Sequence, residues 1–176
     1  AAFLLGAAGI AGVPLLNGFV SKSLLHEAIV EYGGGALMTG VEWIFLFSGG
    51  LTAAYMTKLY IALFWEKHPT RQAEFDAMRR YCSPAASVAL GLSALTLPML
   101  GLTARFSMRK ITEVGLDFFR VGQAEPFPAL LTLENLKGAA ISLAIGAAVY
   151  LLLVRPVLRR KGSYVDLWPK RLDLEE

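Results

Sequence analysis

Four long apolar stretches alternate with polar segments along this chain of 176 residues. They cover residues 1–30, 43–65, 84–104 and 138–154, and the last is the shortest, with 17 uncharged residues. The hydrocarbon core of a membrane is about 30 Å thick, and a helix needs about 20 apolar residues to cross it. The pattern therefore predicts an all-α fold, a polytopic transmembrane helix bundle with four spans.

The first apolar stretch is predicted to be a discontinuous helix. Pro14 has no N–H to donate, and its ring disfavours the helical conformation at the preceding residue. Gly12 weakens the same turn. Within a membrane, a broken backbone is tolerated only where protein or a water-filled cavity satisfies its polar groups. We therefore expect the break to lie against protein or beside such a cavity.

Lys22 is the first charged residue of the chain and follows the break by two helical turns. It lies about 15 Å along the helix from the end near Tyr32, which places it close to the middle of the membrane. A lysine there costs roughly 2.5–3.5 kcal/mol and usually faces a bundle interior or an aqueous path. Its side chain reaches only about 6 Å, too short to carry the amine to the interface. We expect a functional role; the alternatives are buried structural pairing and snorkelling.

The polar segments divide the chain into three regions. Residues 1–67 hold the broken helix and the second span, 68–132 hold a polar loop and the third span, and 133–176 hold the fourth span and a basic tail. Between residues 105 and 137, apolar positions recur at mostly three- and four-residue spacing, with charged residues between them. This spacing predicts an amphipathic helix, either in the membrane interface or packed as a solvated helix on its own protein.

The distribution of basic residues predicts an orientation. Four spans place residues 66–83 and the C-terminal tail on one side, and these two segments hold ten Lys and Arg residues. The segments 32–42 and 105–137 lie on the opposite side and hold five. Because basic residues are enriched in cytoplasmic loops, we expect the loop 66–83 and the tail to be cytoplasmic.

Composition supports a membrane protein and excludes several other classes. Hydrophobic residues make up 55% of the chain, charged residues 18%, and mean hydropathy is +0.51; soluble domains usually carry about a quarter charged residues. The net charge of +3 comes without the basic and aromatic runs of nucleic-acid-binding proteins. Cys82 is the only cysteine and there are two histidines, too few for a metal site. No catalytic motif is present, so we expect no catalytic site and no cofactor.

The candidate chemistry is therefore proton transfer. Burial disfavours the charged form of a lysine, so a buried amine can hold a proton in one state and release it in another. Lys22 and His26 stand at positions i and i+4 and share one helix face. Lys58 is the only charged residue of the second span. The alternatives are that His26 is a polar group wetted at the helix end, and that Lys58 pairs with an acid or snorkels.

The stretch AGVPLLNGFVSKSLL resembles the broken-helix signature of a family of proton-translocating, antiporter-like membrane subunits. Respiratory complex I, multisubunit Na⁺/H⁺ antiporters and energy-converting membrane hydrogenases share this family. The matching residues are Gly12-Val13-Pro14, Gly18-Phe19 and Lys22. The next span is similar to a second family segment, matched at Thr52, Ala53, Tyr55 and Lys58. The resemblance is specific over residues 1–67 and vague beyond them, and the earlier half of the family core is absent from this chain.

The resemblance implies that the chain belongs to a proton-translocating subunit of an NADH-quinone oxidoreductase-type or related complex. Lys22 would be the terminal proton carrier, Lys58 and His26 would assist, and Gly12, Pro14 and Gly18 would form the helix break. The partners would be other membrane subunits, the lipid bilayer and protons, in a bacterial or archaeal cell membrane. The alternatives are a Na⁺/H⁺ antiporter subunit and a non-transporting membrane scaffold. Since Ala1 already lies within an apolar run, we expect a piece of a longer membrane protein.

Overall fold

The computed structural model describes residues 1–33, 35–67, 71–78, 81–120, 128–160 and 163–164. The helices are α1 (Ala2–Ala11), α2 (Asn17–Glu31), α3 (Ala36–Phe64), α4 (Gln72–Ala77), α5 (Pro84–Leu102), α6 (Ala104–Phe119), α7 (Leu133–Val149) and α8 (Arg155–Leu158), with a π-helical turn η1 (Tyr150–Val154) joining the last two. Two strands of two residues each, β1 (Arg159–Arg160) and β2 (Ser163–Tyr164), form an antiparallel pair. The prediction of an all-α fold is confirmed.

Three helices in the described part of the chain are long and apolar enough to cross a membrane: Ala36–Phe64, Pro84–Leu102 and Leu133–Leu158. The prediction is four spans with a discontinuous first helix, and three of the four are found as helices long enough to cross a membrane. The first apolar stretch forms two short helices, α1 with 10 residues and α2 with 15, because the chain leaves the helical conformation between them. The predicted discontinuity of this first stretch is confirmed. The structure thus supports a membrane protein with three spanning helices and one broken element.

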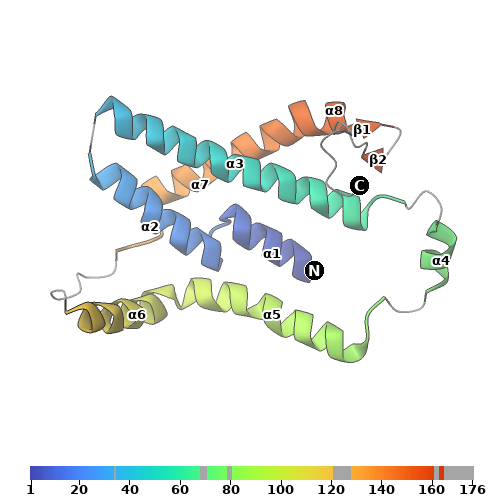
Figure 1. Cartoon of the computed structure of the whole chain (residues 1–176), viewed down its shortest axis with the longest axis horizontal. Helices are drawn as coiled ribbons and strands as arrows, with labels where there is room; N and C mark the ends of the chain where they lie inside the picture. Colours follow the sequence, from blue (N-terminus) through green and yellow to red (C-terminus); the bar gives the residue numbers. More distant parts are fainter. Residues whose placement is uncertain (34, 68–70, 79–80, 121–127, 161–162, 165–176) are drawn as a thin grey trace, which may run out of the picture.

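The broken element lies between two of the long helices (Figure 1). α1 and α2 follow one another across the middle of the molecule, with α3 on one side and α5 on the other, and both short helices contact both long ones. α7 lies along α3, and these two helices share the most extensive contact in the structure. The broken element therefore packs against protein on two sides.

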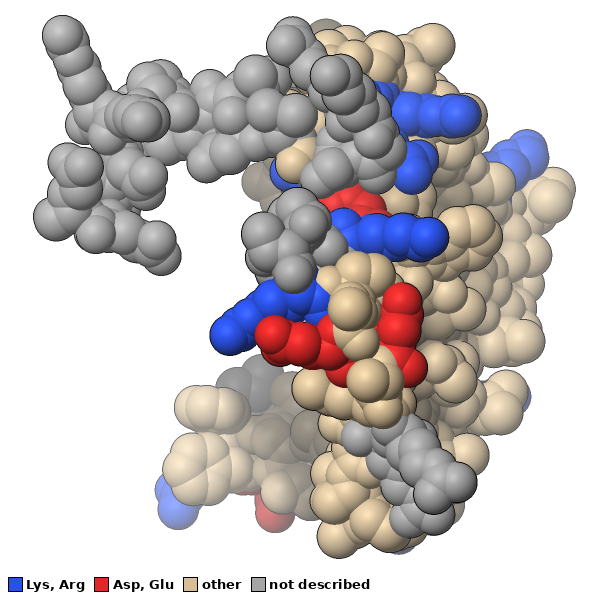
Figure 2. All heavy atoms as spheres, turned by 90° about the vertical axis from the view of Figure 1, so that its right-hand side faces the viewer, with Lys and Arg blue, Asp and Glu red and all other residues tan. Residues whose placement is uncertain are grey.

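The connecting segments lie at two opposite ends of the helices (Figure 1). The α2–α3 turn and α6 lie at one end, and α4 and the strand pair lie at the other. A hydrogen bond of 2.8 Å from the amide of Tyr164 to the Glu66 carboxylate joins the described part of the tail to the 66–83 segment. Charged side chains of both signs gather on this end of the molecule (Figure 2). The expected placement of both segments at one end is therefore seen, whereas which side of a membrane they face stays a prediction.

The predicted amphipathic helix corresponds to α6, which ends where Arg120 adopts a left-handed conformation with φ of 52°. Its apolar side chains face outward: Ile111 is 63% exposed, Val114 70% and Phe118 80%. Packing against the described part of its own chain would have covered these side chains. The interface placement of this helix stays a prediction.

Candidate functional site

The first helix stops at a C-terminal cap centred on Gly12. This residue has φ of 84°, a left-handed conformation that glycine adopts without steric penalty. The amide of Gly12 donates to the Gly9 carbonyl and the amide of Val13 donates to the Ala8 carbonyl, each at 3.0 Å. These two bonds are the pattern of the Schellman motif, which ends a helix while satisfying its carbonyls. Gly12 therefore ends α1, a role that the sequence reasoning had given mainly to Pro14.

Pro14 instead shapes the turn that connects the two helices. The amide of Leu16 donates to the Val13 carbonyl at 3.3 Å across this turn. Pro14 occupies its second position, and Leu15 occupies its third with φ of 72°. Proline followed by a residue with positive φ is typical of a type II turn, in which the third position normally requires glycine or asparagine. Leu15 therefore holds a backbone conformation that residues other than glycine rarely adopt.

Two glycines let other backbone segments approach the break closely. A Cβ atom at Gly18, on the first turn of α2, would collide with the Gly9 carbonyl oxygen of α1. A Cβ atom at Gly101 of α5 would collide with the Leu15 carbonyl oxygen. Gly12, Pro14 and Gly18, the three residues expected at the break, thus end α1, shape the turn and admit the start of α2.

Lys22 reaches back from α2 to the end of α1. Its Nζ donates a hydrogen bond of 3.0 Å to the carbonyl of Ala11, the last residue of α1. A helix C-terminus carries partial negative charge, so this end of α1 attracts the ammonium group. Among the described residues, no carboxylate forms an ion pair with Lys22. The side chain thus points toward the interior break, which is the opposite of snorkelling.

His26 lies one turn further along the same face of α2 and contacts two other helices. Its Nε2 is 3.0 Å from Oε1 of Glu42 on α3, and the side chains are 10% and 33% exposed, respectively. Its ring stacks on Phe45 of α3, with centroids 6.1 Å apart and planes inclined by 14°. Its other ring nitrogen, Nδ1, would be 3.3 Å from a Cβ atom built at Gly138 of α7. The imidazole therefore lies between α3 and α7, in contact with both helices.

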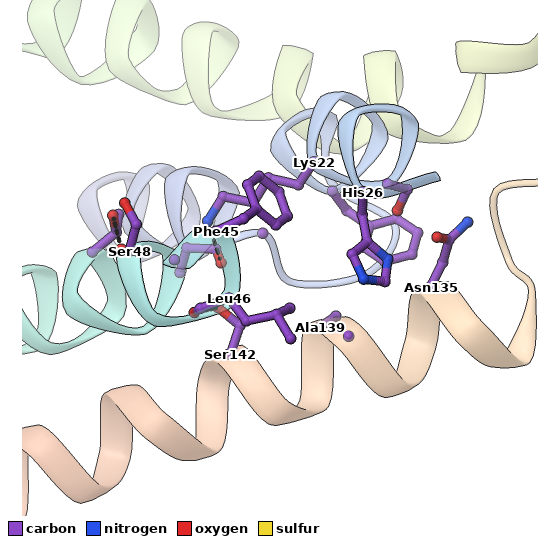
Figure 3. A pocket seen from close by; sticks show the side chains of 15 residues that line it. Lys22, His26, Phe45, Leu46, Ser48, Asn135, Ala139 and Ser142 are labelled. Carbon is purple, nitrogen blue, oxygen red and sulfur yellow. Dashed lines mark hydrogen bonds between the residues drawn. The ribbon is translucent and has the colours of Figure 1, made fainter. Parts of the chain in front are cut away.

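Lys22 and His26 both line a cavity of about 110 Å³ between α2, α3 and α7 (Figure 3). One water needs roughly 10–15 Å³, so the cavity has room for several. Polar groups from all three helices reach its wall, which a water cluster requires for its hydrogen bonds. They belong to Lys22, Ser23, His26, Ser48, Thr52, Asn135 and Ser142.

Close packing of α3 and α7 forms the wall of the cavity next to Lys22. The Ser142 hydroxyl of α7 donates a buried hydrogen bond of 3.0 Å to the Leu46 carbonyl of α3. A Cβ atom at Gly49 of α3 would collide with the Ser142 hydroxyl and would lie 3.4 Å from the Lys22 amine. Ser142 and Gly49 therefore determine how closely this wall approaches the amine.

Lys58 does not belong to this cavity. It lies nearer the other end of α3, where its Nζ is 5.5 Å from the centre of the Tyr164 ring. The Tyr164 hydroxyl is 2.9 Å from that of Tyr150. Burial, and then this hydrogen bond, raise the pKa of Tyr164, so that it stays neutral near Lys58. The structure thus brings together two of the three predicted proton-carrying residues and separates the third.

Sequence reasoning missed Glu42 and Ser142 as members of the site. Glu42 had been assigned to a loop before a span beginning at residue 43, but α3 begins at Ala36, so that Glu42 projects from a helix. The sequence did contain a signal for this role, because Glu42 is an acidic residue that directly precedes the apolar span. Ser142 carried no signal, since a serine in an apolar helix most often bonds within that helix.

The described residues hold no group of three or more His, Cys, Asp or Glu side chains that could bind a metal ion. Comparisons of this chain with family models, with curated proteins and with solved structures found no match. The functional argument therefore rests on the geometry of the broken helix and its cavity.

Proposed function

We propose that this chain carries protons through a membrane as part of an antiporter-like subunit of a larger complex, with Lys22 as the terminal proton carrier. The observation that carries the proposal is the position of the Lys22 amine. It lies at a break in an apolar helix, on a cavity with room for water. Intramembrane lysines in such positions commonly mark ion paths.

The partner of Lys22 suits a group that gains and loses a proton. An ammonium group has three N–H donors, and a neutral amine still has two. The hydrogen bond to the Ala11 carbonyl therefore survives deprotonation, and the side chain need not move between the two states. A carboxylate partner would instead hold the charged form, because an opposite charge nearby stabilises it. That is the arrangement expected of a structural scaffold, and among the described residues neither Lys22 nor Lys58 forms such a pair.

The proposal also covers the membrane crossing, the residues that assist Lys22, the orientation and the partner subunits. α1 and α2 together form a fourth, interrupted crossing of the membrane beside the three long helices. His26 shares the cavity and assists Lys22, while Lys58 assists from the opposite part of α3. The end carrying residues 66–83 faces the cytoplasm, so the α2–α3 turn faces outward. The partners are the other membrane subunits of an NADH-quinone oxidoreductase-type or related complex.

Membrane vesicles that contain the complete complex provide the test, with an acidification-sensitive dye and the natural electron donor. Lys22→Ala should lower proton transport at least tenfold while the complex still assembles. Lys137→Ala is the matched control, because Lys137 is an exposed lysine on α7. Transport at the wild-type rate with Lys22→Ala would refute the proposal. Transport that requires added sodium would instead identify Na⁺/H⁺ exchange.

A further inference from the structure

We infer that Glu42 is the outlet of the Lys22 cavity: it receives protons from His26 and releases them to water at the end of the helices where α2 turns into α3. The inference rests on the proposed function and names the group that completes its outward path. It comes from the contact between His26 and Glu42, which joins a residue lining the cavity to one that reaches the surface.

The exposed fractions of the His26 and Glu42 side chains indicate the direction of the proton path. The His26 side chain is 10% exposed and lines the cavity, whereas the Glu42 side chain is 33% exposed and lies outside the cavity wall. The 3.0 Å between Nε2 and Oε1 is a hydrogen-bond distance that permits direct proton transfer. The His26–Glu42 pair therefore connects the cavity that Lys22 lines with the more exposed surface at Glu42.

The imidazole ring has the two sites that a relay needs. Nε2 faces Glu42, while Nδ1 lies against Gly138, whose α7 backbone also lines the cavity. A proton from a cavity water binds the free nitrogen, and the proton on the nitrogen facing Glu42 passes to Oε1. The ring is neutral again, and Glu42 releases its extra proton to water. A turn of the ring about its side-chain bonds then presents the protonated nitrogen to Glu42 once more.

Glu42 is the acid that this geometry selects at this end of the helices. Glu27 follows His26 directly on α2 but does not line the cavity. Glu31 is exposed at the end of α2, and no ion pair joins it to His26 in the described structure. Among the described acids, only Glu42 has a carboxylate oxygen within hydrogen-bond distance of a side chain that lines the cavity.

The variant Glu42→Gln tests whether Glu42 releases protons or only joins α2 to α3 through its hydrogen bond with His26. The glutamine amide oxygen still accepts a hydrogen bond from the ring, so the hydrogen bond between α2 and α3 is retained. The amide cannot take up and release a proton near neutral pH. In the complete complex, we expect at least a tenfold loss of proton transport per assembled molecule with Glu42→Gln and a comparable loss with His26→Gln. Glu31→Gln, the matched control at the same end, should transport at the wild-type rate.

The double variant His26→Gln/Glu42→Gln tests whether the two residues act in series. Residues that act as one unit are strongly non-additive, so the double variant should transport no more slowly than the slower single variant. A further loss, equal to the product of the two single effects, would overturn the relay.

The outcomes distinguish this inference from the function on which it rests. Wild-type transport with Glu42→Gln, together with lost transport in Lys22→Ala, overturns the outlet and leaves Lys22 as carrier. Wild-type transport with Lys22→Ala refutes the function itself. If Glu42→Gln lowers the amount of assembled complex, His26→Gln decides: transport per assembled molecule at the wild-type rate would overturn the relay.

Discussion

The amine of Lys22 and the carbonyl of Ala11 are joined by a hydrogen bond of 3.0 Å across the break between α1 and α2. The side chain passes directly over Gly12, where a Cβ atom would lie 2.7 Å from Cδ of the lysine. The absence of a side chain at Gly12 thus serves two purposes. It permits the left-handed backbone that ends α1, and it leaves the space through which the lysine reaches the end of that helix.

Gly12→Ala should therefore impair both stability and transport. The left-handed conformation costs an L-residue roughly 1–2 kcal/mol, and the added methyl group displaces the Lys22 side chain from Ala11. We expect a lower melting temperature of the purified complex and a several-fold loss of proton transport in vesicles.

Gly35→Ala is the control for the cost of placing a side chain on a backbone with positive φ, without any effect on Lys22. Gly35 also has positive φ, 64°, but a Cβ atom there meets nothing within 4 Å. Its ψ of −149° lies in a region that is essentially restricted to glycine, so Gly35→Ala should lower stability at least as much as Gly12→Ala and leave transport per assembled molecule unchanged. Equal transport in the two alanine variants would show that the contact between Lys22 and α1 is dispensable.

The local features of the site were predictable from sequence, whereas its contacts between helices were not. Glycine followed two residues later by proline signals a helix end, and the i, i+4 spacing places Lys22 and His26 on one face. These are properties of neighbouring residues. The partner of His26 depends on where α3 begins, and a glycine-rich turn does not fix that position within a few residues. Lys58 was grouped with Lys22 because both are lysines in apolar spans, but its position along α3 places it beside Tyr164.

The α3–α7 contact beside the cavity yields a prediction about compensation. A Cβ atom at Gly49 would collide with the Ser142 hydroxyl, yet it would lie 3.6 Å from the Ser142 Cβ, an ordinary contact. Gly49→Ala alone should therefore destabilise the complex by about 1–3 kcal/mol through overpacking. Ser142→Ala alone should cost about 1 kcal/mol, since it loses one hydrogen bond to Leu46.

The double variant Gly49→Ala/Ser142→Ala should be more stable than the sum of the single effects implies. Removing the hydroxyl makes room for the new methyl group, so the coupling should be favourable by about 1 kcal/mol or more, as for residues in direct contact. Chemical denaturation of the purified complex measures the free energy of unfolding of the wild type, of the two single variants and of the double variant. Additive effects would mean that α3 and α7 do not pack as closely as the structure has them. Gly40→Ala, on the same helix with nothing within 4 Å of its Cβ, is the control.

Cys82 offers a direct measurement of orientation. It is the only cysteine of the chain and is exposed in the segment between α4 and α5. If this end of the helices faces the cytoplasm, a membrane-impermeant maleimide should label Cys82 in inside-out vesicles and leave it unlabelled in intact spheroplasts. Thr112→Cys in a Cys82→Ser background should show the reverse, because Thr112 is exposed on α6 at the opposite end. Labelling of Cys82 from outside would invert the proposed topology and would overturn the role of Glu42 as an outlet.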